Sequence, residues 1–154
     1  MFKKILVPYD GSELAAKAFP TVMELAKAFN AKVTLVHVCY VEAVGEATPG
    51  VIATAPAAEK KVCEAFLSKA GKEFQDQGIT TEWLCLDGVP AREIIAYADK
   101  EKMDLIAMAT HGKGEVAWVL GSTAERVVSH APVPVLLIRV MEFKPPLLKE
   151  EYFL

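Results

Sequence analysis

One stretch of the chain, residues 109–123, is rich in groups that can hold an anion. It contains three glycines, Gly112, Gly114 and Gly121, and the last of them is followed by two hydroxyl residues, Ser122 and Thr123. Glycines let a bound group approach the backbone without meeting a side chain, and this stretch lies between a predicted strand and a predicted helix. Because N–H groups at the start of a helix favour phosphate, the stretch predicts a phosphate-bearing ligand, with a nucleotide as the leading candidate.

The same residues also have two purely structural interpretations. The glycines can serve turn geometry alone. Ser122 and Glu125 have the spacing of a capping box, in which the serine hydroxyl bonds to an N–H group of its own helix. A hydroxyl can accept one hydrogen bond and donate another, so capping and ligand binding are compatible.

A second candidate segment, Pro8 to Ser12, follows the first predicted strand. Asp10 could accept a hydrogen bond from a base or a ribose, face a phosphate-bound cation, or close the turn with Gly11. No nucleophile with a base partner and no pair of carboxylates is evident, so we expect no demanding catalysis.

The three histidines lie on different predicted elements and have no metal-ligand spacing: His37, His111 and His130. His37 is predicted to be a core residue. His111 is predicted to be structural or to touch the ligand.

The pattern of apolar residues predicts an α/β fold. Short β-branched runs predict five strands: Lys4 to Pro8, Lys32 to Cys39, Ile79 to Leu86, Met103 to Ala109 and Pro134 to Val140. Helical spacing predicts four helices, which begin at Ser12, Ala58, Pro90 and Ser122. The first is expected to have a kink at Pro20. The second is expected to end at Gln77 and to have a buried stripe that begins at Val62. Alternating strands and helices imply a mostly parallel sheet with helices on both faces. Ligands of such folds bind where the strand order reverses, which would bring both candidate segments together.

Composition and charge predict one soluble domain, residues 1–140, with a C-terminal extension, residues 141–154. The net charge of -3 predicts no binding to nucleic acid or to a membrane, and no signal peptide or membrane span is evident. The three cysteines are predicted to be reduced core residues of a cytosolic protein: Cys39, Cys63 and Cys85. Residues 41–57 are either a lid or a disordered loop, and the extension is either a disordered tail or a docked arm.

Four segments together resemble the universal stress protein family: Lys4-Ile-Leu-Val-Pro-Tyr-Asp-Gly-Ser-Glu13, Thr34-Leu-Val-His-Val38, Asp104-Leu-Ile-Ala-Met-Ala-Thr-His-Gly112, and residues 121–139 from Gly-Ser-Thr-Ala-Glu-Arg onward. The resemblance implies a Rossmann-like α/β sandwich with five parallel strands in the order 3-2-1-4-5. It also implies a cytoplasmic homodimer that pairs through the last strand, residues 134–140. One branch of the family binds ATP and another does not.

The ATP-binding branch has a glycine motif that this chain matches imperfectly. The resemblance maps its glycines onto Ala109, Gly112 and Gly121-Ser122, so an alanine replaces the first glycine. The spacing between the second and third positions is also one residue short, which reduces the reach of the loop by up to about 3.5 Å. By the same resemblance, Asp10 and the Val38 backbone meet adenine or ribose. The predicted site comprises Pro8, Tyr9, Asp10, Val38, Ala109, His111, Gly112, Gly114, Gly121, Ser122 and Thr123.

These observations predict a dimeric stress-response regulator or sensor that binds ATP or AMP together with Mg²⁺ or Mn²⁺. Any hydrolysis is expected to be slow. The alternative is a nucleotide-free dimeric interaction module of the same family.

Overall fold

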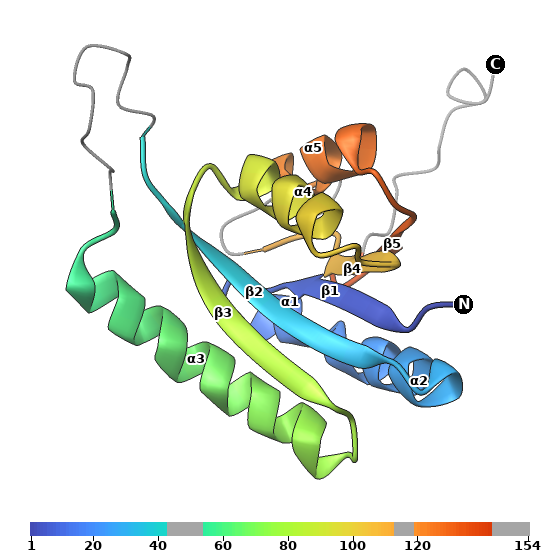
Figure 1. The fold of residues 1–154 in the computed structure, drawn as a ribbon. Helices are drawn as coiled ribbons and strands as arrows, with labels where there is room; N and C mark the ends of the chain where they lie inside the picture. The colour runs from blue at the N-terminus through green and yellow to red at the C-terminus, as the bar shows by residue number, and fades with distance from the viewer. Residues whose placement is uncertain (43–53, 113–118, 143–154) are drawn as a thin grey trace, which may run out of the picture.

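The computed structural model describes residues 1–42, 54–112 and 119–142, and a five-stranded parallel sheet forms its centre (Figure 1). The strand order is β3-β2-β1-β4-β5, and every neighbouring pair is parallel. The strands are β1 (Lys4–Pro8), β2 (Lys32–Tyr40), β3 (Thr81–Gly88), β4 (Leu105–Ala109) and β5 (Val135–Ile138). The predicted fold class and strand order are therefore confirmed.

Two layers of helices cover the sheet, one on each face (Figure 1). The helices are α1 (Glu13–Ala16), α2 (Phe19–Phe29), α3 (Ala57–Asp76), α4 (Pro90–Lys100) and α5 (Ser122–His130). Residues of α2 and α3 pack on one face, and residues of α4 and α5 pack on the other. Right-handed crossovers require this division, because the chain moves toward β3 in its first half and toward β5 in its second.

Successive residues of the central strands enter different cores. Ile5 and Val7 of β1 lie in the core beneath α2 and α3, whereas Leu6 lies in the core beneath α4 and α5. All three side chains are at most 2% exposed. Parallel strands that are covered on both faces need apolar residues at every position, which explains the uninterrupted Ile-Leu-Val run in the sequence.

Two helical predictions differ from the structure. Pro20 lies in the first turn of α2, where an N–H group is not needed, so the chain forms two helices here instead of one kinked helix. In α3, Val62 is 63% exposed and its neighbour Cys63 is buried. The apolar stripe was therefore assigned one residue out of phase at its start.

The structure contradicts the prediction of three reduced thiols. Cys63 of α3 and Cys85 of β3 form a disulfide, with Cα atoms 6.3 Å apart, and Cys39 is a buried free thiol. The pairing joins residues 22 positions apart in the chain, and it depends on how α3 packs across β3. Spacing in the sequence carries no such information.

Other predictions fall outside the described residues. They concern Gly114, most of the segment 41–57 and most of the extension 141–154. No described helix has both the length and the apolar character needed to span a membrane.

Candidate functional site

A cavity of about 150 Å³ lies at the carboxyl ends of β1 and β4. The strand order reverses between these two strands, which is where ligands bind in folds of this kind. The volume corresponds to roughly five water molecules at their liquid density, so it suits a small organic group better than a single ion. Eight residues of the predicted site line it: Pro8, Tyr9, Asp10, Val38, Ala109, His111, Gly112 and Thr123.

The loop after β1 and the loop after β4 approach each other closely at Asp10 and Gly112. A Cβ atom on residue 112 would collide with Oδ2 of Asp10. Gly112 is not among the described glycines with positive φ, so the close approach, and not backbone conformation, explains the need for glycine here. Both residues line the cavity.

A local turn fixes the Asp10 carboxylate at the start of α1. Its Oδ1 atom accepts hydrogen bonds from the Ser12 backbone N–H at 2.9 Å and from the Ser12 hydroxyl at 2.6 Å. The Ser12 hydroxyl in turn accepts a bond from the Ala15 N–H at 3.1 Å and caps the helix. Both interpretations of Asp10, as a turn residue and as a residue facing a ligand, are thus geometrically compatible.

Alanine is accommodated without strain at the position of the first motif glycine. Ala109 is the last residue of β4 and pairs with Ile138 of β5. Its φ is not positive; the described non-glycine residues with positive φ are Asn30 and Lys102. The methyl group of Ala109 therefore sits on an ordinary strand backbone at the wall of the cavity.

His111 is held by the protein on both sides of its ring. Nε2 lies 2.6 Å from the Val119 carbonyl oxygen, and Nδ1 lies 2.8 Å from the Thr110 hydroxyl. Because a carbonyl only accepts, Nε2 carries the hydrogen, and in the neutral ring Nδ1 accepts from Thr110. His111 is 4% exposed, so of the two roles predicted for it, this geometry supports the structural one.

The start of α5 differs from the predicted capping box. The helix begins at Ser122, its N-cap is Gly121, and no side chain caps it. Ser122 is exposed, and neither it nor Gly121 lines the cavity, whereas Thr123 and Ala124 do. Glycine at the N-cap leaves the first N–H groups of the helix without a side-chain acceptor.

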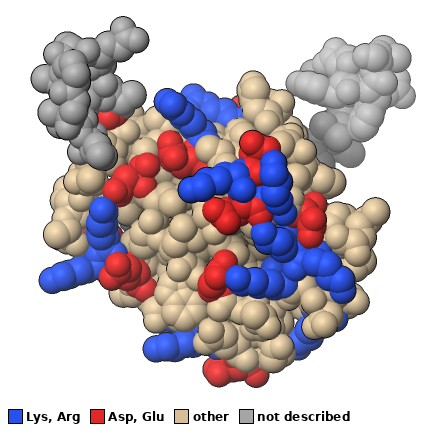
Figure 2. Space-filling model, in the orientation of Figure 1, with Lys and Arg blue, Asp and Glu red and all other residues tan. Residues whose placement is uncertain are grey.

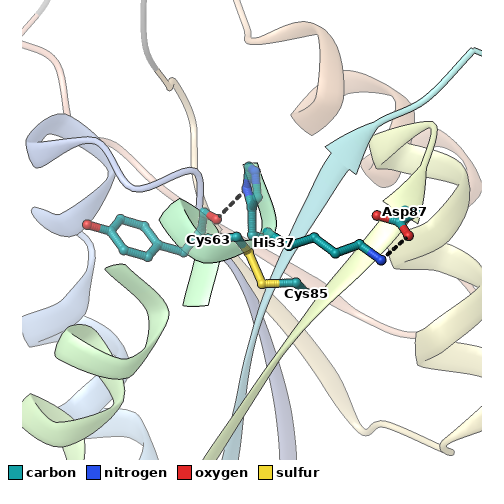
Figure 3. Close-up of a disulfide and its surroundings, with 6 residues drawn as sticks. His37, Cys63, Cys85 and Asp87 are labelled. Carbon is teal, nitrogen blue, oxygen red and sulfur yellow. Dashed lines mark hydrogen bonds and ion pairs between the residues drawn. A yellow bond between two sulfur atoms is a disulfide. The ribbon is translucent and has the colours of Figure 1, made fainter. Parts of the chain in front are cut away.

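His37 is a site residue that the sequence did not reveal. It lines the cavity, its ring packs edge-on against Phe66, and its Nδ1 donates to the Tyr9 carbonyl oxygen at 3.0 Å (Figure 3). Burial lowers the pKa of His37, although the Tyr9 carbonyl and the carboxylates of Asp10 and Glu59 act in the opposite direction. Burial likewise raises the pKa of Tyr9, and the charge of Asp10 adds to this effect.

The other missed lining residues come from both faces of the sheet: Ala15, Val36, Pro90, Ile94, Met108, Thr110 and Ala124. Pro90 and Ala124 belong to the first turns of α4 and α5. A rule that places helix N-termini at the carboxyl edge of a parallel sheet would have found these two. Ala15 and Ile94 depend on tertiary packing and have no comparable signal.

Charged side chains of both signs are interspersed on the face that carries α3 and α4 (Figure 2). Two ion pairs belong to this region, Lys60 with Asp87 at 3.0 Å and Lys32 with Glu82 at 2.8 Å. The Lys32 ammonium, followed by the Thr34 hydroxyl, lowers the pKa of Glu82. Such mixed pairs on a half-exposed surface contribute little to stability.

Comparison with known proteins identifies the family. The model of the universal stress protein family matches residues 1–139. A universal stress protein of Methanocaldococcus jannaschii is 37% identical over 141 residues, which are 90% of this chain and 83% of the relative.

Solved structures agree with this fold. A universal stress protein in complex with cAMP has a TM-score of 0.68 at 22% identity and covers 91% of this chain and 98% of its own. The Archaeoglobus fulgidus universal stress protein in complex with dAMP has a TM-score of 0.69 at 22% identity, and covers 90% of this chain and 99% of its own. The chain described here belongs to the universal stress protein family.

Proposed function

We propose that this protein binds an adenine nucleotide, ATP or AMP, in the cavity between β1 and β4 and acts as a stress-response sensor or regulator. The observation that carries the proposal is the approach of Asp10 to Gly112 at the cavity wall. A carboxylate that accepts hydrogen bonds suits the hydroxyls of ribose or the amino group of adenine. The residue opposite has no side chain to occupy the same space.

The start of α5 supports the position of the phosphates. Thr123 and Ala124 line the cavity, and the helix has no side-chain cap. The N–H groups of the first turn of α5 and the positive end of the helix dipole favour an anion at this point. Mg²⁺ or Mn²⁺ would accompany the phosphates and neutralise part of their charge.

The imperfect glycine motif is compatible with this proposal. Ala109 lies on a strand backbone, and its methyl group requires no unusual φ. A backbone hydrogen bond from the Gly121 N–H to the Thr110 carbonyl at 3.1 Å holds the start of α5 next to the end of β4, despite the shorter spacing between Gly112 and Gly121. The relatives crystallised with cAMP and dAMP support an adenine nucleotide as the ligand.

We expect any hydrolysis of the nucleotide to be slow. Both ring nitrogens of His111 are engaged by Thr110 and Val119, so this ring is not available as a general base. The role that follows is one of binding and signalling.

The homodimer is proposed to form at β5. The sheet order puts β5 at one edge of the described sheet, and all four of its residues are only half-buried. Half-buried aliphatic side chains on an edge strand suit pairing with a second copy. We further propose that the protein acts in the cytoplasm.

A thermal unfolding series separates the nucleotide sensor from the interaction module. A ligand that binds only the native state stabilises it by about 2.7 kcal/mol at a concentration one hundred times its Kd. ATP with Mg²⁺ should therefore raise the unfolding midpoint of the wild-type protein. An unchanged midpoint at millimolar ATP and at millimolar AMP would favour the nucleotide-free dimeric interaction module.

A further inference from the structure

Three sulfur atoms and an imidazole gather between β2, β3 and α3. A ring nitrogen of His37, the Cys39 sulfur and the Cys63 sulfur all lie within 4.8 Å of one another. The Cys85 sulfur is bonded to that of Cys63. Figure 3 shows His37 beside this disulfide.

The sheet register explains why these residues meet. His37 and Cys39 are two positions apart on β2, so their side chains point to the same face of the sheet. Cys85 of β3 is the register partner of His37, which places it on that face as well. Cys63 faces the sheet from α3 and is 1% exposed.

We propose that the reduced protein binds one Zn²⁺ ion through His37, Cys39 and Cys63, with the released Cys85 as the fourth ligand. Three thiolates and one imidazole form one of the usual ligand sets of tetrahedral structural zinc. Zinc–sulfur and zinc–nitrogen bonds of ordinary length put the ligand atoms about 3.5–3.8 Å apart. The ligand atoms of His37, Cys39 and Cys63 need to approach one another by at most about 1.3 Å to reach this geometry.

The surroundings favour an uncharged His37 ring and a bound cation. Burial lowers the pKa of His37, which is the direction that suits a metal ligand, because the bound imidazole must be uncharged. A metal bound through Nε2 would keep the bond from Nδ1 to the Tyr9 carbonyl oxygen, an arrangement typical of metal-bound histidines. The Asp87 carboxylate, whose Oδ1 atom is buried without a hydrogen-bond partner, belongs to the register partner of Cys39.

The disulfide and the metal exclude each other, because Cys63 cannot bind zinc while it is bonded to Cys85. A dithiol reductant transfers two electrons and two protons to the Cys63–Cys85 bond and becomes a disulfide itself, which leaves two thiols. Zn²⁺ then replaces the thiol protons of Cys39, Cys63 and Cys85, and three protons pass to solvent. Zinc binding therefore reports the redox state of this pair.

The direct test compares zinc affinity before and after reduction of the full-length protein. Dithiothreitol opens the disulfide and is removed by anaerobic gel filtration, and Zn²⁺ is then titrated in competition with a chromophoric chelator. The reduced wild type should bind one Zn²⁺ per chain at least ~100-fold more tightly than the oxidised wild type, since loss of a mere supporting partner already costs 10–100-fold. Equal affinities of the two forms would overturn the proposal.

Variants identify the ligands. Cys39→Ser leaves the Cys63–Cys85 disulfide intact, yet after reduction it should lose the tight site, as should His37→Ala. His130→Ala is the matched control, because His130 is an exposed residue of α5. Circular dichroism melting verifies that each variant is folded, and Co²⁺ substitution reports thiolate bonds through a charge-transfer band. The proposed site would be contradicted if both Cys39→Ser and His37→Ala bound Zn²⁺ with wild-type affinity. It would also be contradicted if the Co²⁺ complex of the reduced protein lacked that band.

Discussion

Oδ2 of Asp10 lies so close to Gly112 that a Cβ atom on residue 112 would collide with it. The two residues follow different strands, β1 and β4, and are 102 positions apart in the chain. Their approach brings a carboxylate and a bare stretch of backbone to the same wall of the cavity. The proposed nucleotide function depends on this arrangement.

Gly112→Ala is predicted to weaken nucleotide binding with little loss of fold stability. The added methyl group displaces the end of the Asp10 side chain, which can rotate away because it is only a side-chain terminus. We expect Kd for ATP to rise at least about tenfold, which is ~1.4 kcal/mol, as measured by isothermal titration calorimetry.

Gly78→Ala is the matched control for that substitution. Gly78 has φ +79° and open space around the position of a Cβ atom, so alanine should reduce the free energy of unfolding by about 1–2 kcal/mol. It should leave ATP affinity unchanged, since Gly78 lies after α3 and outside the cavity lining. If both variants changed ATP affinity equally, the Asp10–Gly112 contact would have no specific role in nucleotide binding.

Ser12→Ala and Ser122→Ala should differ in their effect on stability. Ser12 caps α1 through the Ala15 N–H and also donates to Asp10, so its loss should reduce the free energy of unfolding by about 1 kcal/mol. Ser122 is exposed and caps nothing, so its loss should change that free energy by less than about 0.5 kcal/mol. Urea denaturation measures both values. A larger loss of stability in Ser122→Ala than in Ser12→Ala would indicate that Ser122 caps α5, as the sequence predicted.

The disulfide-intact protein should lose stability as the pH falls below the ordinary pKa of histidine, about 6.5. Burial lowers the pKa of His37 in the folded state. Between the two pKa values the unfolded chain binds more protons than the folded one, so stability falls as the pH decreases. Urea denaturation at about pH 7.5 and about pH 5.5 should show this decline in the wild type and in His130→Gln, and a smaller decline in His37→Gln. An undiminished decline in His37→Gln would assign the effect to other groups.

Reduction of the Cys63–Cys85 disulfide should destabilise the metal-free protein. The bond closes a loop of 22 residues, for which the chain-entropy model gives roughly 3 kcal/mol. Urea denaturation with a chelator, in the presence and absence of dithiothreitol, measures the difference. Cys39→Ser should show the same response to dithiothreitol, because Cys39 is outside the bond; a stability that reductant does not change would contradict the disulfide.

Periodicity in the sequence was sufficient for the α/β class and the five strands, whereas the strand order followed from the family resemblance. The apolar runs of β1 and β4 and the Gly78 stop after α3 have local physical causes, so the strands, most helix positions and the cavity edge could be predicted. The capping of α5 could not be predicted, because Ser122 and Gly121 are adjacent and a one-residue shift decides which is the N-cap.

Contacts across the fold account for the remaining differences. Cys63, Cys85 and His37 are separated in sequence, and only the β2–β3 register with α3 above it brings them together. Cys63 was expected in the core, but nothing in the sequence indicated that it lies beside His37 and Cys85.

Isothermal titration calorimetry of the wild-type protein with ATP and Mg²⁺ tests the central proposal most directly. We expect one nucleotide to bind per chain, and Gly112→Ala to bind it more weakly under the same conditions. The absence of binding heat for ATP and for AMP at several temperatures, with folded protein throughout, would contradict it.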